Sequence, residues 1–479
     1  MVVAEIKPFW VDEWRVIYNL KYKNAAMLWG PLDFLQQFPR TYLVIIKTFT
    51  SLFDYSYFAL RLPSWLVGTF TIVFCYRLMN KIYTRSHFNR FLFVMILVSA
   101  STFTCYYVQI KQYTMDILLS LAAIWQLIEL LKLKDKKIRD KGMYFLLCTS
   151  FLIVPFFSYT YPIAIAPVFI IQLVQSVLLM KNGNIATGKA RILLLQWFPL
   201  FLCAVSISVF FIIDVSQLMA DKGMHQYWGH LMMDGGFNWS SFFYEFYNLF
   251  AEVGSGLLFW YIFGILGIIS FLYGITTSTK NFLKNKNHIN YIMVLYSTLL
   301  LTLVIILFIS GKFPLGEPRL NAFTIPAISI LMIGFLEQLN QKGKQAIISK
   351  TLSVILYAGV TGNIYTTFFA DFTGPGYARK MDIYRSSEKA ILLAQSKKIP
   401  ILITPEIAWP YDKTLNFPFM NTVPGDWVLK TFPAYHVAEN IPVYAISSLD
   451  SLPENLKLLP ANVTSVLAGD GRSFQIIKR

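Results

Sequence analysis

Residues 290–311 read NYIMVLYSTLLLTLVIILFISG, a run that contains no Asp, Glu, Lys, Arg or His. A helix needs about 20 predominantly apolar residues to cross the hydrocarbon core of a bilayer. The run has this length and lacks charge throughout. It therefore predicts a transmembrane helix, and it decides that the chain is a membrane protein.

The same pattern recurs along most of the chain. We predict ten spans of this kind, at 62–83, 88–105, 113–132, 143–157, 160–180, 190–213, 256–279, 290–311, 319–338 and 348–370. The segment 38–53 is also apolar, but Lys47 interrupts it. We expect it to form an interfacial or re-entrant helix rather than a span.

The composition agrees with this class of protein. Of the 479 residues 56% are hydrophobic and 14% are charged, and the mean hydropathy is +0.52. Soluble domains contain about 45–50% apolar and about 25% charged residues. An ordinary soluble enzyme and a disordered chain are therefore excluded. The four cysteines, at positions 75, 105, 148 and 203, form no CxxC pair and are expected to be small buried hydrophobes.

The net charge of +16 is unevenly distributed between the loops. Alternate inter-span loops carry 4 basic residues, and the other set carries 19, namely Arg77, Lys81, Arg85, Arg90, Lys132, Lys134, Lys136, Lys137, Arg139, Lys141, Lys181, Lys189, Arg191, Lys280, Lys284, Lys286, Lys342, Lys344 and Lys350. Cytoplasmic loops are rich in Lys and Arg. The bias predicts that the basic set faces the cytoplasm, and it explains the charge without nucleic acid as a partner.

This orientation divides the chain into three parts. Residues 1–61 form an outer segment, 62–370 form the transmembrane domain, and 371–479 form a small extracytoplasmic α/β domain with an expected helix at 384–395 and strands at 399–404, 441–446 and 474–477. An outer segment of this length without a leading span is uncommon. We therefore expect that a first transmembrane helix is missing before Met1.

Ionisable residues are nearly absent from the middles of the ten spans. Ion-coupled transporters usually place such residues near the midplane. The polar residues gather instead in the outer loops. This arrangement favours an enzyme that works at the outer membrane surface, with a transporter or flippase of lipid-linked sugars as the alternative.

Three outer stretches combine charged and aromatic residues: Phe9–Trp14 with Asp12 and Glu13, Tyr106–Asp116, and Gly311–Leu320 with two cations, one acid, two glycines and two prolines. Each also has a plain interpretation. The acids can be a solvated surface, the tyrosines a membrane-interface belt, and the cations contacts to lipid phosphates. His225 and His230 are five positions apart and do not share a helix face, so we expect them to be packed or solvated and not to bind zinc.

Taken together, these stretches resemble the GT-C glycosyltransferases, in the branch of bacterial type that contains the protein O-mannosyltransferases and the lipid A aminoarabinose transferase. The resemblance covers roughly residues 1–340 and is carried by Asp12-Glu13, Gln36-Gln37-Phe38-Pro39, Arg61-Leu62-Pro63-Ser64, Lys111–Asp116 and Phe313–Arg319. The motifs are specific for the superfamily, but they do not specify the substrate. The chain departs from the family in lacking a helix before Asp12 and in having Gln109 where relatives often have an acid.

The resemblance implies a sugar transfer from a polyprenyl-phosphate donor to the hydroxyl of a glycan, lipid or protein acceptor, in the plasma (bacterial inner) membrane. It implies that Asp12, with Glu13 beside it, is the catalytic base, and that Arg319, with Lys312 as a weaker candidate, binds the donor phosphate. The second outer loop contributes Gln109, Lys111, Gln112, Tyr113 and Asp116. We predict no metal-ligating residue, and no cofactor besides the lipid-linked sugar and membrane lipid is indicated.

Overall fold

The structure is a computed structural model. It describes residues 11–33, 36–53, 57–83, 86–133, 140–181, 187–216, 238–251, 253–254, 257–283, 289–340 and 345–366, together with five short strands between positions 401 and 478. The expected helix at 384–395 and the histidines at positions 225 and 230 lie outside the described residues.

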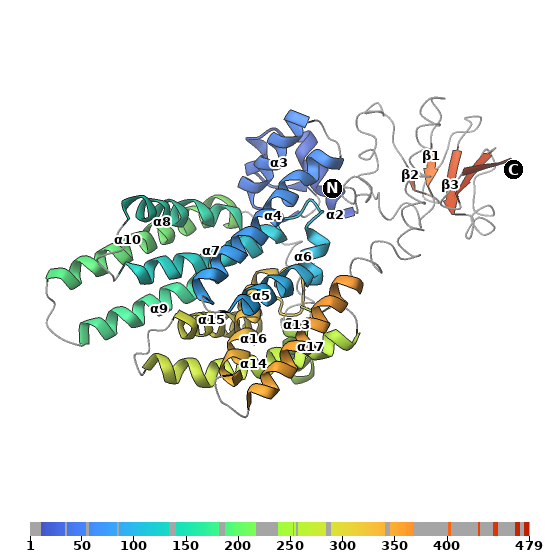
Figure 1. Cartoon of the computed structure of the whole chain (residues 1–479). Helices are drawn as coiled ribbons and strands as arrows, with labels where there is room; N and C mark the ends of the chain where they lie inside the picture. The colour runs from blue at the N-terminus through green and yellow to red at the C-terminus, as the bar shows by residue number, and fades with distance from the viewer. Residues whose placement is uncertain are drawn as a thin grey trace.

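The described part from 11 to 366 is almost entirely helical (Figure 1). Its α-helices are α2 (Val11–Tyr22), α3 (Arg40–Phe53), α4 (Tyr57–Ile82), α5 (His87–Ser99), α6 (Ser101–Tyr106), α7 (Tyr113–Lys132), α8 (Lys141–Ile153), α9 (Tyr161–Lys181), α10 (Thr187–Phe210), α13 (Trp239–Ala251), α14 (Leu257–Leu283), α15 (Ile289–Ile309), α16 (Ile325–Asn340) and α17 (Ala346–Tyr365). Short helical turns are η1 (Met27–Trp29), η4 (Val154–Phe157), η5 (Phe211–Val215, a π-helical turn) and η6 (Ala322–Thr324).

All ten predicted spans correspond to helices of the structure. Eight helices are long and apolar enough to cross a membrane, and two shorter apolar segments, His87–Ser99 and Lys141–Phe157, occupy the positions of the remaining two. The predicted fold class, a polytopic α-helical membrane protein, is confirmed. The first span begins at Phe58, earlier than the predicted residue 62.

Side-chain contacts show that successive helices cross in alternating directions. At one end of the bundle, Lys81 binds Glu129, and Asn89 and Asn290 both bind Glu337. The opposite ends of the helices make a separate set of contacts, such as those of Asp116 with Ser158. The contacts of Glu129 and Glu337 lie at the helix ends that are flanked by the basic loops. Spans that alternate in direction bring these ends to the same side of the bundle.

Helix α7 lies at the centre of the bundle. It is apolar on all sides, and 83% of its membrane-crossing segment is buried, the largest share among the eight long helices. Helices α4, α8, α9 and α10 surround it on one side, while α14, α15, α16 and α17 pack together on the other (Figure 1). A helix that is hydrophobic all round belongs in such an interior position.

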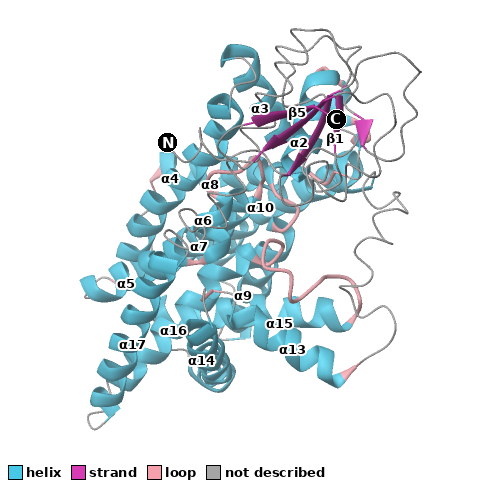
Figure 2. Ribbon diagram, turned by 90° about the vertical axis from the view of Figure 1, so that its right-hand side faces the viewer, coloured by secondary structure: helices cyan, strands magenta, loops and turns pink. Residues whose placement is uncertain are grey.

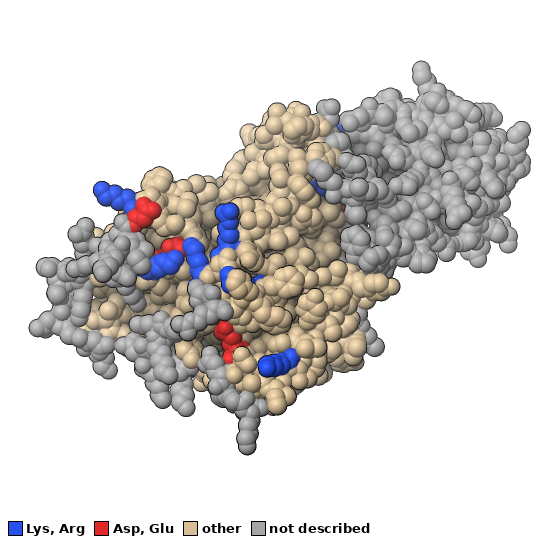
Figure 3. All heavy atoms as spheres, viewed as in Figure 1, with Lys and Arg blue, Asp and Glu red and all other residues tan. Residues whose placement is uncertain are grey.

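The outer helices expose apolar side chains instead of burying them. On α10, Leu194 is 70% exposed and Phe201 is 62% exposed. Figure 3 shows that most of the visible face of the helical part carries no charge. Apolar surface of this extent on a helical bundle is the surface that contacts lipid.

Two helices lie at the end of the bundle where the outer loops meet. The segment predicted to be interfacial forms α3, which sits with α2 beside the start of α4 (Figure 1). Helix α13 was not predicted, because its sequence lies in a stretch expected to be a loop. It packs against α14 and exposes Trp239, Phe243 and Tyr244.

The C-terminal part contains a five-stranded sheet (Figure 2), in the order β2 (Lys430–Thr431), β1 (Ile401–Ile403), β3 (Tyr444–Ser448), β4 (Ser465–Gly469) and β5 (Phe474–Lys478). Strands β2, β1, β3 and β4 pair in parallel, and β5 is antiparallel to β4. Strands were expected at the sites of β1, β3 and β5. The other two were not predicted, because β2 has two residues and β4 follows a Thr-Ser step without clear alternation.

Candidate functional site

The carboxylate of Glu13 is fully buried and joins three parts of the chain. The Arg61 Nη2 atom lies 3.1 Å from Glu13 Oε2, and Arg61 Nε lies 3.3 Å from Oε1. The backbone N–H of Ile110 also donates to Oε1, at 2.9 Å. Helix α2, helix α4 and the second outer loop are therefore held together at one charged contact.

This contact changes the interpretation of two residues. Arg61, which entered the sequence analysis only as part of the stretch Arg61–Ser64 that carries the resemblance, lies inside α4 and is 0% exposed. Glu13 was named with Asp12 as a catalytic candidate, and its oxygens are already engaged by a guanidinium and a backbone donor. Asp12 lies in α2, and its side chain is outside the described residues.

Residues 108–112 of the second outer loop are buried, although three of the five are polar or charged. Lys111 is 5% exposed, and its Nζ atom donates to Gln36 Oε1 at 3.1 Å. The rings of Tyr106 and Tyr113, on either side of the loop, meet edge to face with centroids 4.5 Å apart. The loop is therefore held by the packing of Tyr106 against Tyr113 and by the hydrogen bond from Lys111 to Gln36 in the segment before α3.

Three polar atoms in this loop and the start of α7 have no hydrogen-bond partner within the described part of the chain. They are Gln109 Oε1, Gln112 Oε1 and Thr114 Oγ1, and all are buried. An unsatisfied buried polar group costs about 1–3 kcal/mol, so such atoms are rare and call for an explanation. A ligand that brings hydroxyl groups would supply the missing donors.

Asp116 lies one turn into α7 and is 4% exposed. Its Oδ1 atom accepts a hydrogen bond from the Ser158 hydroxyl, which also lies 3.0 Å from the Thr160 hydroxyl. The backbone N–H groups of Thr160 and Tyr161 donate to the same serine oxygen. Asp116 thus joins the second outer loop to the turn before α9.

The late outer loop is rigid for reasons visible in its sequence. Gly311 has φ of 66° and ends α15, a conformation that favours glycine. The Asn321 side chain donates to the carbonyl groups of Pro314, Leu315 and Glu317 at 2.6–3.1 Å. A single amide therefore closes the loop on itself just before η6.

The two cations of this loop have different surroundings. Arg319 is partly buried, lies close to the phenol groups of Tyr113 and Tyr106, and its Nε atom is 2.5 Å from Glu317 Oε1. Lys312 is exposed. Arg319 thus lies next to the second outer loop, and this proximity agrees with the prediction that Lys312 is the weaker of the two candidates.

Helix α13 supports the late loop through a close approach at Gly316. A Cβ atom at this position would lie 1.3 Å from Glu245 Oε2, so a side chain here requires the Glu245 carboxylate to move. Burial, together with the nearby Glu317 carboxylate, raises the pKa of Glu245 above its ordinary value. The loop carries Arg319 on a backbone whose path depends on this glycine.

A second buried ion pair at the same end was not predicted. The backbone N–H of Arg40 donates to Asp214 Oδ2 at 3.0 Å, and Tyr159 lies 2.7 Å from Asp214 Oδ1. Burial and the Asp214 carboxylate raise the pKa of Tyr159 well above its usual value. An acid at the end of an otherwise apolar span was the only signal for this cluster in the sequence.

The structure thus brings together most of the predicted site residues. Glu13, Gln109, Lys111, Gln112, Tyr113, Asp116 and Arg319 lie on elements that contact one another at one end of the bundle. Among the described residues, no group of three or more His, Cys, Asp or Glu side chains could hold a metal ion.

Comparisons with known proteins find a likeness in fold. No protein-family model matches the chain, and no curated protein matches its sequence. The crystal structure of ArnT from Cupriavidus metallidurans bound to undecaprenyl phosphate superposes with a TM-score of 0.50 at 12% sequence identity, over 96% of this chain and 86% of that one. The same protein in the apo state gives a TM-score of 0.46 at 13% identity over the same shares.

The chain therefore shares the fold of this ArnT structure, and the predicted resemblance is confirmed at the level of the fold.

Proposed function

We propose that this protein is a membrane glycosyltransferase that moves a sugar from a polyprenyl-phosphate donor to an acceptor hydroxyl. The reaction takes place at the end of the bundle where α2, the second outer loop and the late outer loop meet. The observation that carries the proposal is the convergence of these three segments, within a fold shared with a protein whose structure contains undecaprenyl phosphate.

We assign the catalytic base to Asp12 and a positioning role to Glu13. Neighbouring residues of a helix point about 100° apart, so a helix that directs Glu13 to Arg61 directs the preceding residue elsewhere. Glu13 is a poor base, because protonation would break a buried pair with Arg61. Asp12 keeps the role that the resemblance implies.

The second outer loop is suited to the sugar. Gln109 Oε1, Gln112 Oε1 and Thr114 Oγ1 are buried acceptors within six residues, and sugar hydroxyls are donors. Lys111, held by Gln36, and Asp116, held by Ser158, give this loop a fixed shape before substrate arrives. Tyr113 packs against Tyr106 and lies beside Arg319, between the proposed sugar site and the proposed phosphate site.

Arg319 supplies the contact to the donor phosphate. Its guanidinium can form two parallel hydrogen bonds to phosphate oxygens, and at a partly buried site this pairing is stronger than in bulk water. The Glu317 contact uses Nε, so a phosphate would bind through the Nη atoms or displace Glu317. Lys312, exposed on the same loop, is a secondary contact.

The step balances without further reactants. The acceptor oxygen attacks the anomeric carbon and forms the new glycosidic bond, while the bond from that carbon to the phosphate oxygen breaks. The acceptor proton passes to Asp12, and the polyprenyl phosphate leaves with the bonding electrons. Arg319 stabilises the charge that develops on the leaving phosphate.

The proposal is tested with purified protein in detergent and a radiolabelled polyprenyl-phosphate sugar. Release of polyprenyl phosphate together with a labelled acceptor supports it. Movement of the intact lipid-linked sugar between the leaflets of vesicles, with no release, would instead identify a flippase. We further propose that this end of the bundle and the C-terminal sheet face the extracytoplasmic side of a plasma membrane. The excess of Lys and Arg in the alternate loops supports this orientation.

A further inference from the structure

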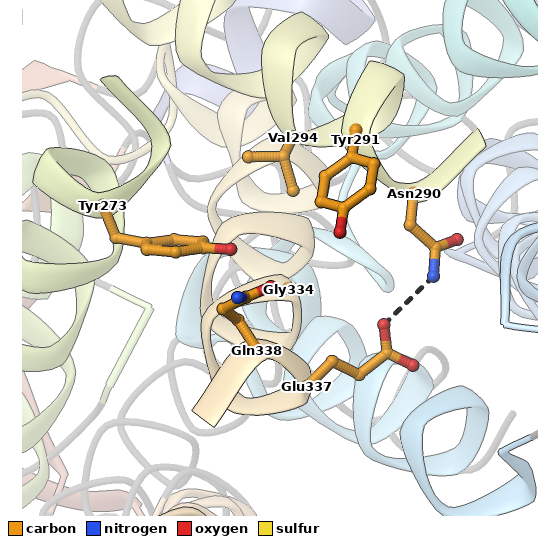
Figure 4. Close-up of a pocket in the computed structure, with 7 residues that line it drawn as sticks. All are labelled: Tyr273, Asn290, Tyr291, Val294, Gly334, Glu337 and Gln338. Atoms are coloured by element: carbon orange, nitrogen blue, oxygen red, sulfur yellow. Dashed lines mark hydrogen bonds between the residues drawn. The ribbon is translucent and has the colours of Figure 1, made fainter. Parts of the chain in front are cut away.

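A cavity of about 270 Å³ lies at the end of the bundle opposite the candidate site. It opens between the C-terminal half of α14, the C-terminal end of α16 and the first residues of α15, and Figure 4 shows its lining residues. They are Tyr273, Asn290, Tyr291, Val294, Gly334, Glu337 and Gln338. None of them belongs to the outer-loop site.

The cavity contains a carboxylate in a fixed position. Asn89 Nδ2 donates to Glu337 Oε1 at 2.9 Å, and Asn290 Nδ2 donates to Glu337 Oε2 at 3.1 Å. One amide comes from α5 and the other from α15, so the acid is oriented from two helices. The site is therefore built before any ligand binds, as most small-molecule sites are.

Two tyrosines give the cavity an aromatic wall. Tyr273 and Tyr291 come from different helices, and Figure 4 shows both hydroxyl groups directed toward the space over Gly334. The ring of Tyr273 is supported by Phe335, with centroids 5.4 Å apart. A carboxylate combined with aromatic rings is the chemistry that binds an ammonium group, through ion pairing and cation–π contact.

The depth of the cavity matches the headgroup region of a bilayer. Tyr273, Asn290 and Glu337 lie within four residues of the ends of their membrane-crossing segments. At 1.5 Å per residue, this places them within about 6 Å of those ends. These are also the ends flanked by the basic loops, so the leaflet concerned is the one that faces those loops.

We propose that this cavity binds the ammonium headgroup of a phospholipid, with phosphatidylethanolamine as the fitting example. Its volume of about 270 Å³ is just below the range of about 300–1,000 Å³ that holds drug-sized ligands, which suits a small headgroup. Glu337 accepts hydrogen bonds from the ammonium group, and the faces of the tyrosine rings contact the ammonium group and its neighbouring methylene groups. The acyl chains lie along the exposed apolar side of α14, where Ile269 and Leu272 are exposed.

The test is native mass spectrometry of the full chain in detergent, with phosphatidylethanolamine and phosphatidylglycerol of equal acyl length. Glu337→Gln and Tyr273→Leu should each weaken phosphatidylethanolamine binding by at least tenfold. Tyr273→Phe, which keeps the ring, should bind as the wild type does. Glu129→Gln is the matched control, because Glu129 is a buried carboxylate at the same end of the bundle that binds Lys81 and Lys132 outside the cavity.

Thermal unfolding midpoints are measured for every variant. A variant that binds less lipid at an unchanged midpoint has lost binding and not folding. Tyr273→Phe removes only a hydroxyl group, whereas Tyr273→Leu removes the aromatic ring. Equal binding of phosphatidylglycerol by the wild type would overturn the ammonium assignment. Unchanged lipid binding by both Glu337→Gln and Tyr273→Leu would overturn the location. Binding of soluble phosphoethanolamine as tightly as the lipid would overturn the membrane as the source.

Discussion

Arg61 and Glu13 are 48 positions apart in the chain, and they form a fully buried ion pair with three nitrogen–oxygen contacts of 3.1–3.3 Å. The pair fixes α2 against α4. The Ile110 N–H that shares the Glu13 carboxylate ties the second outer loop to the same point. The acid beside Asp12 therefore sets the distance between the outer segment and the loop proposed to bind the sugar.

Breaking this pair should destabilise the protein before it affects the chemistry. Removing one partner of a buried ion pair costs about 3–5 kcal/mol, because the other charge stays buried. We expect Glu13→Gln and Arg61→Met each to lower the unfolding midpoint in detergent. The double substitution Glu13→Leu with Arg61→Met should recover part of the loss. Strictly additive losses, or a stable but inactive Glu13→Gln, would contradict the positioning role.

Asp12→Asn should act in the opposite way. We expect it to reduce turnover by about 100- to 10,000-fold, the usual contribution of a general base, while the unfolding midpoint stays unchanged. Both quantities are measured on the same purified sample. Near-normal turnover by Asp12→Asn would move the base to another carboxylate, and Asp116→Asn would be the next variant to measure.

Arg319→Ala should weaken the affinity for the donor. Loss of a charged hydrogen bond costs about 1.5–3 kcal/mol, which corresponds to roughly a 10- to 150-fold increase in Kd. The donor affinity of Arg319→Lys should lie between those of the wild type and Arg319→Ala, because an ammonium group keeps the charge but does not reproduce the two parallel hydrogen bonds of a guanidinium. Lys312→Ala, an exposed cation on the same loop, is the matched control. An equal effect of both alanine variants would mean that the loop contacts bulk lipid without selecting the donor.

Gly316→Ala should disturb the late loop, since its Cβ would overlap the Glu245 carboxylate. We expect a lower donor affinity with little change in the affinity for the acceptor. Glu245→Ala removes the obstacle, so the double variant should bind the donor more tightly than Gly316→Ala alone. A double variant that shows no recovery would mean that Gly316 is needed for another reason.

The orientation can be tested with single cysteines in a background without the four native ones. A cysteine at position 136, within the basic loop after α7, should be protected from an impermeant thiol reagent in intact cells. A cysteine at position 238, at the start of α13, should be labelled. The reverse pattern would place the proposed site in the cytoplasm and contradict the proposed orientation.

The fold was largely accessible from sequence, because crossing a membrane leaves a long apolar signature. Residues 290–311 and nine other runs identified every span, including the two short segments that became α5 with α6 and α8 with η4. Helix α13 was missed for the same reason. Its sequence, WSSFFYEFYNLFA, is amphipathic and only 13 residues long, so a search for spans does not detect it.

The site was only partly accessible. Residue types in the outer loops singled out Arg319 and the second outer loop as candidates, but side-chain pairing across 48 or 174 positions leaves no local pattern. Arg61 and Arg40 were therefore not recognised as partners of Glu13 and Asp214. Burial of a polar loop such as 109–112 is equally invisible, since its polar sequence is typical of a solvated turn.

We propose above all that the phosphate of the donor lipid binds where the outer loops meet. The most direct measurement uses a photoactivatable polyprenyl-phosphate analogue, with the crosslinked peptides identified by mass spectrometry. We predict crosslinks within residues 106–116 and 311–321, reduced in Arg319→Ala and unchanged in Lys312→Ala. Crosslinks confined to α14, α15 and α16 around Tyr273 and Glu337, and unaffected by Arg319→Ala, would contradict the account.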